Sequence, residues 1–96
     1  MKMLMLVYSG SDPQRVAAVL DAHAGGGYSE FRDVRGAGAT GRREGSRAWP
    51  GTSTMFVSVV PGDTVDALVA RLREERDRLP AGERLHVTVL PAESFF

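Results

Sequence analysis

The chain has 96 residues, of which 43% are hydrophobic and 25% are charged, a length and composition that predict one small globular domain. Its 12 basic and 12 acidic residues cancel, so no overall positive charge draws it to nucleic acid or to an anionic membrane surface. It has no cysteine, which excludes thiolate chemistry and suits a reducing cytoplasm, and its longest apolar run, residues 3–8, is too short to insert into a membrane.

The first part of the chain predicts a strand, a helix and a second strand. Residues 2–8 are apolar apart from Lys2 and end at a Ser-Gly-Ser turn, which is typical of a buried strand. We expect Asp12 to cap a helix with Pro13 at its first position, because apolar residues then recur at helical spacing up to three consecutive glycines. In residues 28–34 the apolar positions lie three apart, which permits a helical turn. Flanking glycines leave too few residues for a helix, so a strand is favoured.

The second part predicts a long loop, a strand, a helix and a last strand. Residues 36–53 contain five glycines and have no apolar period, so they form the loop, and residues 54–60 are rich in strand-forming side chains. The helix begins at Asp63, with Asp66 at capping-box spacing, and residues 85–90 alternate as a strand. The buried stripe of this helix comprises Val65, Leu68, Val69, Leu72 and Leu79, and its solvated face comprises Arg71, Arg73, Glu74, Glu75, Arg76, Asp77 and Arg78.

The predicted order of elements is βαββαβ, which places the chain in the α+β class. Right-handed crossovers then give a ferredoxin-like fold over residues 1–96, in which a four-stranded antiparallel sheet carries both helices on one face. The first and third strands are apolar at nearly every position, so both of their faces need burial. Because one chain offers nothing to cover the second face, we infer self-association through open sheet faces or edges.

The loop at residues 36–53 is the segment richest in features that can bind a ligand. Residues 36–41 match the string GxGxxG, but no helix follows to direct its dipole at a pyrophosphate, so we do not expect a dinucleotide site. Arg42, Arg43 and Arg47 stand against one acidic residue, Glu44. With the glycine amides they suit an anion or an acidic partner surface, and a solvated hairpin loop is the alternative.

Trp49 is the only tryptophan of the chain, and it lies in the same loop. A tryptophan in a loop either anchors the loop on its own core or offers an aromatic contact to a ligand or partner. Anchoring is the more common of these two roles.

No assembled catalytic apparatus is visible in the sequence. The two histidines, His23 and His86, have no serine, cysteine or further histidine at triad or metal-site spacing, so we expect a protein that is not an enzyme. We interpret His23 as a helix-terminal residue and His86 as a sheet-face residue. They are weak candidates for metal ligands, and we expect no resident metal.

Two segments resemble the nitrogen regulatory PII proteins and their PII-like relatives. Residues 26–38 read GGYSEFRDVRGAG, which contains the V-R-G-x-G that ends the family's second strand, and residues 59–63 read VVPGD, similar to its V-V-P-x-D. The resemblance implies βαββαβ homotrimers that signal rather than catalyse. It also implies nucleotides or other small effectors in clefts between subunits, and a loop after the second strand that docks onto a target protein.

Carried over by position, the resemblance assigns roles to residues of this chain. The ligand-binding residues would be Gly36, Gly38, Arg42, Arg43 and Arg84, and the docking loop would contain Arg47 and Trp49.

The chain also departs from the family. Its loop is shorter and holds no tyrosine, since Tyr8 and Tyr28 lie elsewhere, so uridylylation is not expected. Gly82-Glu83-Arg84 replaces a phosphate-contacting loop that ends in Gly-Lys, and the family's later arginines have no counterpart after residue 90. We therefore do not expect ATP binding of the standard kind.

From this resemblance we expect a cytoplasmic, PII-like homotrimer. It would bind an adenine nucleotide or another small anion between subunits and regulate a target, such as a transporter or an enzyme of nitrogen metabolism, by changing the order of the loop at 36–53. The alternative is a divalent-metal-binding or metal-tolerance protein of the same fold, with His23 and His86 as its nitrogen ligands.

Overall fold

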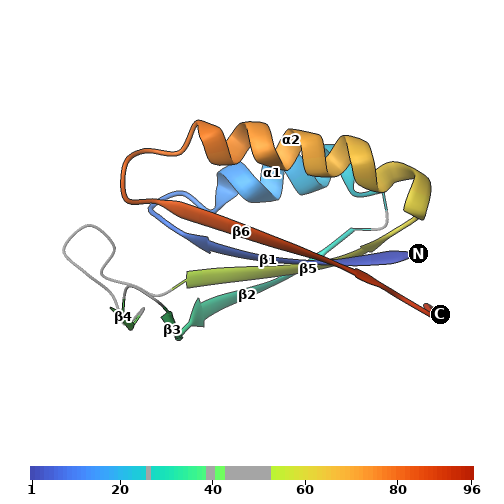
Figure 1. Cartoon of the computed structure of the whole chain (residues 1–96), viewed down its shortest axis with the longest axis horizontal. Helices are drawn as coiled ribbons and strands as arrows, with labels where there is room; N and C mark the ends of the chain where they lie inside the picture. Colours follow the sequence, from blue (N-terminus) through green and yellow to red (C-terminus); the bar gives the residue numbers. More distant parts are fainter. Residues whose placement is uncertain (26, 39–40, 43–52) are drawn as a thin grey trace.

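A computed structural model describes residues 1–25, 27–38, 41–42 and 53–96 of the chain (Figure 1). Two helices lie on one face of the main sheet, and both chain ends lie at the end of the sheet opposite a small hairpin. No helix in the described ranges is long and apolar enough to cross a membrane. The elements are β1 (Lys2–Ser9), α1 (Gln14–His23), β2 (Ser29–Val34), β3 (Ala37–Gly38), β4 (Gly41–Arg42), β5 (Ser53–Val60), the 3₁₀ turn η1 (Gly62–Thr64), α2 (Val65–Asp77) and β6 (Arg84–Pro91).

The main sheet has four strands in the order β2-β5-β1-β6, and every neighbouring pair is antiparallel. This order, with both helices on one face, confirms the predicted α+β, ferredoxin-like fold. The most apolar strand, β1, lies inside the sheet between β5 and β6, and β2 and β6 form the two edges.

One face of the sheet packs against the helices. Successive side chains of a strand point to opposite faces, so Leu4, Leu6 and Tyr8 of β1 point together towards α1 and α2, and each is at most 1% exposed. They pack with Phe56 of β5, whose ring meets Tyr28 edge-on at a centroid distance of 5.8 Å. The rest of the core comprises Val16, Ala17, Val19, Leu20, Ala24, Val60, Leu68, Leu72 and Leu85.

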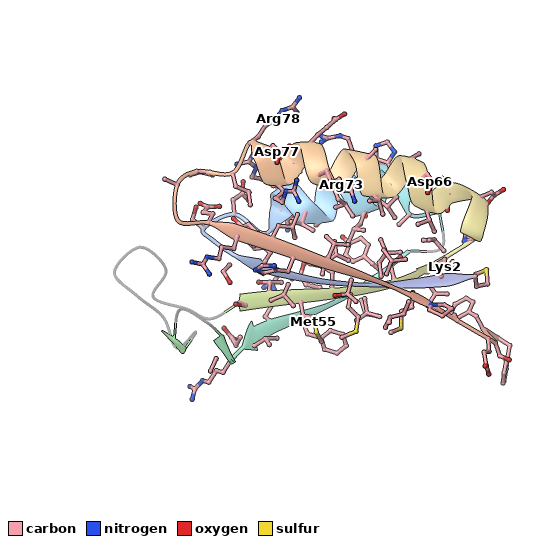
Figure 2. All side chains as sticks on the ribbon, in the orientation of Figure 1. Lys2, Met55, Asp66, Arg73, Asp77 and Arg78 are labelled. Carbon is pink, nitrogen blue, oxygen red and sulfur yellow. The ribbon has the colours of Figure 1, made fainter. Side chains whose placement is uncertain are left out.

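The opposite face of the sheet is also largely apolar, and none of the described helices covers it. Figure 2 shows Met55 on the side of the sheet away from α1 and α2. The strand register places Met55 opposite Val7 of β1 and Phe31 of β2, and Phe31 is 47% exposed. We call this surface the outer face; its other apolar members are Met3, Met5, Val34, Val57, Val59 and Leu90. The prediction that β1 and β5 are apolar on both faces is therefore confirmed.

The three-residue spacing in β2 has a structural cause. The pairing of β2 with β5 shifts between Phe31 and Val34, and Asp33 adopts the left-handed conformation with φ 58°. This bulge adds a residue, so that Phe31 and Val34 both lie on the outer face although they are three apart in sequence. The strand prediction for this segment is correct, and the misleading helical period comes from the bulge.

Both predicted helix caps are wrong. Helix α1 begins after Pro13, and Asp12 makes no side-chain capping hydrogen bond. At the second helix the turn η1 comes first, and Thr64, whose hydroxyl donates to the Pro61 carbonyl at 2.8 Å, precedes α2. Asp63 therefore does not cap the helix, because the chain enters α2 through this 3₁₀ turn.

The expected loop at 36–53 contains regular structure at both ends. Ala37 pairs with Arg42 and Gly38 with Gly41 in the β3–β4 hairpin, and Ser53 already belongs to β5. Strands of two residues are too short to show a pattern in sequence, which explains why this hairpin was not predicted.

Because of its charge, Glu75 is predicted to lie on the solvated face of α2, but the structure shows that it does not belong there. It is 7% exposed, and its carboxylate accepts hydrogen bonds from Arg15 of α1 at 3.0 Å and from Arg71 at 2.9 Å. Burial alone would raise the pKa of Glu75, but the hydrogen bonds from Arg71 and Arg15 outweigh it and lower the pKa below its ordinary value. The glutamate thus joins the two helices above the core.

Replacing Glu75 tests this helix–helix ion pair. We expect Glu75→Gln to lower the free energy of unfolding by about 1–3 kcal/mol at pH 7, because two partly buried arginines lose their partner. A lowered folded-state pKa stabilises the protein above the ordinary pKa of 4.5, and this stabilisation is lost as pH falls through the folded value. The difference between wild type and variant should therefore shrink below pH 4.5 in urea denaturation.

The matched control is Glu74→Gln, because the Glu74 side chain is 59% exposed and its nearest arginine nitrogen is 3.9 Å away. It should change the free energy of unfolding by less than about 0.5 kcal/mol. Equal losses in the two variants would show that Glu75 does not join the helices.

Candidate functional site

The candidate site lies at the end of the sheet from which the segment 36–52 leaves. Because the strands are antiparallel, β1 and β2 end where β5 and β6 begin, and the β3–β4 hairpin lies beside them (Figure 1). We call this region the loop end of the sheet and define it by Ser9, Val34, Ser53 and Arg84, which occupy the last paired positions of the four strands.

These four residues form a row across the sheet. Ser9 is opposite Arg84 and Val34 is opposite Ser53 in the strand register. The hydroxyls of Ser9 and Ser53 are 2.6 Å apart and hydrogen-bonded, and Ser53 is only 1% exposed. This contact ties the end of β1 to the start of β5, so the point at which the chain enters β5 is fixed.

The structure brings some predicted site residues to this end. Gly36 follows β2 by two residues and is half-buried, Gly38 and Arg42 belong to the hairpin, and Arg84 begins β6. Arg43, Arg47 and Trp49 lie outside the described residues. The ligand-binding and docking roles of all these residues stay predictions.

A hydrogen-bond network that sequence reasoning missed lies behind this row. The Tyr8 hydroxyl, at the end of β1, donates to Glu83 Oε1 at 2.6 Å and accepts from the backbone N–H of Asp12 at 2.9 Å. The Ser11 hydroxyl donates to Glu83 Oε2 at 3.2 Å. The turn between β1 and α1 is therefore joined to the turn between α2 and β6; we call this set of contacts the Tyr8–Glu83 clamp.

The phenol of Tyr8 remains protonated over the whole physiological pH range. Burial and the hydrogen bond to Glu83 raise the pKa of Tyr8 to about 12. Its hydroxyl is therefore a permanent donor to the carboxylate. No local pattern indicated this pair, since Tyr8 and Glu83 are 75 positions apart.

Gly10 leaves the space that the clamp occupies. A Cβ atom at this position would collide with the Tyr8 hydroxyl and ring and with Glu83 Oε1. Gly10 is therefore required here by close packing rather than by an unusual backbone angle.

The two histidines cannot share a metal ion within one chain. His23 lies in the last turn of α1, on the helix side of the sheet, whereas His86 is opposite Val7 and thus lies on the outer face. Among the described residues, no group of three or more His, Cys, Asp or Glu side chains is placed to hold a metal ion.

Two hollows lie away from the loop end. One, of about 180 Å³, lies between α2 and β6, and aliphatic side chains line it with Arg73 and Arg76. The other, of about 280 Å³, lies where Phe95 meets β2 and β5. Neither is lined by the residues of the row or of the clamp.

Comparison with known proteins defines the class of the fold. No model of a protein family and no curated protein matches the sequence. Solved structures do match it, and they show that the chain has the fold of PII-like proteins, which confirms at the level of the fold the resemblance seen in the sequence.

Several of the matching structures are of CPII, a nitrogen regulatory PII-like protein from Thiomonas intermedia K12. CPII bound to ADP, AMP and bicarbonate superposes with a TM-score of 0.67 at 22% identity, over 93% of this chain and 84% of CPII. CPII bound to ADP and bicarbonate gives 0.66 at 22% identity with the same coverage. The apo form of CPII gives 0.62 at 16% identity, over 93% of this chain and 87% of CPII.

Replacing Gly10 tests the packing of the clamp. We expect Gly10→Ala to lower the free energy of unfolding by about 1–3 kcal/mol, because the added methyl group displaces the buried Tyr8 ring or the Glu83 carboxylate. Gly25→Ala is the matched control, since a Cβ atom there meets nothing within 4 Å. Urea denaturation of both variants checks the difference, and a Gly10→Ala protein as stable as Gly25→Ala would contradict the close packing.

Proposed function

We propose that this protein is a PII-like sensor that binds a small anion, an adenine nucleotide or bicarbonate, at the loop end of the sheet and between subunits. The observation that carries the proposal is the likeness to CPII over 93% of the chain, because CPII has been solved with ADP, AMP and bicarbonate. The loop end supplies chemistry that suits such ligands, namely the guanidinium of Arg84 and the backbone amides near Gly36.

The positions of these groups favour a site shared by two copies. Gly36 follows β2 and Arg84 begins β6, and these strands are the two opposite edges of the sheet. Three strand spacings of roughly 4.8 Å separate the edges, about 14 Å in all, which an ion as small as bicarbonate cannot span. When copies pack side by side, the β2 edge of one meets the β6 edge of the next, and both groups border one cleft.

The outer face supplies the driving force for this assembly. None of the described helices covers its methionines, its valines or the exposed Phe31, and an apolar sheet face of this kind is typical of an interaction surface. A homotrimer in which the outer faces turn inward buries this surface and forms three clefts between sheet edges. The homotrimer is part of the proposal.

The segment between β2 and β5 provides the output. Its two ends are held by the β3–β4 hairpin and by Ser53, so an anion bound near Gly36 contacts the chain just where the segment begins. A ligand that binds one arrangement of the segment more tightly shifts its population, and a target protein that recognises this arrangement then reads the ligand. A transporter or an enzyme of nitrogen metabolism is the proposed kind of target.

A charge on the outer face should separate the copies. We expect Val57→Glu, near the middle of this face, to convert the trimer into a monomer at micromolar concentration, because assembly would bury an unpaired carboxylate. Sedimentation equilibrium measures the mass. Ala70→Glu, on the exposed side of α2, is the control and should remain trimeric. A wild-type protein that is monomeric at micromolar concentration would overturn the shared site.

Calorimetry tests the ligand and the residue that holds it. We expect wild-type protein to bind at least one of ADP, AMP and bicarbonate, and Arg84→Ala to weaken this binding about tenfold or more, because a charge-assisted hydrogen bond is lost. Arg73→Ala is the matched control, since Arg73 lies on α2 beside the hollow rather than at the loop end. Its affinity should stay within about twofold of wild type.

The single tryptophan reports on the loop in the same titration. Trp49 lies in the segment 36–53, so ligand binding that reorders the segment should change its fluorescence. No heat and no fluorescence change with any of the three ligands would contradict the proposed function.

A further inference from the structure

We propose that Tyr8 and Ser11 are positioning residues that hold the Glu83 carboxylate on the helix side of the sheet, away from the anion site at Arg84. The proposal rests on the proposed function and adds a determinant of anion affinity that lies outside the binding cleft. It is based on the position of Glu83, which directly precedes the predicted anion-binding residue Arg84 in the sequence. Both oxygens of the Glu83 carboxylate are hydrogen-bonded to a different part of the chain.

Adjacent residues at the start of a strand point to opposite faces. Arg84 is opposite Ser9, whose hydroxyl meets Ser53 on the outer face, whereas Glu83 reaches Tyr8, whose ring lies in the helix-side core. The clamp therefore separates two opposite charges that sequence places side by side. The anion site keeps its arginine while the nearby negative charge is turned to the other face.

The contacts are strong enough to hold the carboxylate. Each oxygen of Glu83 accepts one hydroxyl hydrogen bond, and the Tyr8 ring that carries one of these hydroxyls is 1% exposed and cannot follow a moving side chain. The Asp12 amide donates to the same Tyr8 oxygen, which fixes the direction in which the phenol proton points. Because Gly10 has no side chain, no Cβ atom at this position pushes the Tyr8 hydroxyl and the Glu83 carboxylate apart.

Loss of the Tyr8 hydroxyl would release this charge. A glutamate freed at residue 83 can turn around the end of β6 and approach Arg84, where it competes with the anion and repels it. A full negative charge within about 5 Å of an anion in aqueous surroundings weakens binding by roughly three- to tenfold. The effect depends on the charge of residue 83, which separates it from a general loosening of the turn.

The experiment compares Tyr8→Phe, Glu83→Gln and the double variant Tyr8→Phe/Glu83→Gln with wild type. Calorimetry with ADP, AMP and bicarbonate should show binding about three- to tenfold weaker in Tyr8→Phe, and the double variant should recover to within about twofold of Glu83→Gln. Tyr28→Phe is the matched control for removing a phenol hydroxyl, because Tyr28 lies beside Phe56 and away from the clamp. It should bind as wild type does.

A double variant that binds as weakly as Tyr8→Phe would overturn the proposal, since the charge of Glu83 would then play no part. Unchanged binding in Tyr8→Phe would overturn it as well, while leaving the proposed function intact.

Amide hydrogen exchange of residues 81–86 without ligand tests the clamp independently of binding. Tyr8→Phe should exchange at least about fivefold faster there than wild type and Tyr28→Phe, because the turn before β6 loses its anchor. Equal rates would refute the clamp whether or not an anion binds. Failure of wild type to bind any of the three anions, with faster exchange in Tyr8→Phe, would refute the proposed function and with it the role of the clamp in affinity.

Discussion

The structure depends on the position of β1, an apolar strand placed between two others with apolar side chains on both faces. Leu4, Leu6 and Tyr8 are buried under the helices, whereas Met3 and Met5 point to a face that none of the described helices covers. The helices cover one side, and within the proposed function a second copy of the chain covers the other side. The fold, and the assembly proposed above, thus both depend on the same hydrophobic strand.

Antiparallel pairing then decides where the chemistry gathers. Since β1 ends where β5 and β6 begin, Tyr8, Ser9 and Ser53 come together with the turn that carries Glu83 and Arg84. Side-chain alternation separates this group into two faces. Ser9, Ser53 and Arg84 share the outer face near the segment 36–52, and Tyr8 and Glu83 share the helix side. Within the proposed function, the outer side of this row binds the anion and the helix side supports it.

Periodicity predicted the order of elements, the antiparallel sheet and the covered and uncovered faces, because burial acts residue by residue along a helix or strand. It could not predict contacts between distant positions. The sequence neighbours of Glu75 are those of a surface residue, but in the structure Glu75 is buried beside Arg15 of α1. The partners Tyr8 and Glu83 are 75 positions apart. The bulge at Asp33 gave the apolar residues of a strand the three-residue spacing of a helix. The resemblance assigns Arg84 to the site, but it assigns no role to the neighbouring Glu83, whose negative charge repels an anion.

The presence of Glu83 beside Arg84 is itself informative about ligand selection. A bare arginine attracts any anion, and the attraction grows with the charge of the ligand, whereas a fixed carboxylate nearby subtracts a penalty that also grows with that charge. Such a neighbouring carboxylate therefore lowers the affinity of highly charged ligands more than that of singly charged ligands. Within the proposed function, Glu83 held behind Arg84 by Tyr8 therefore reduces the advantage that a triphosphate would have over a small or weakly charged anion. The clamp keeps this penalty constant, because a carboxylate fixed by two hydroxyls cannot move to suit each ligand.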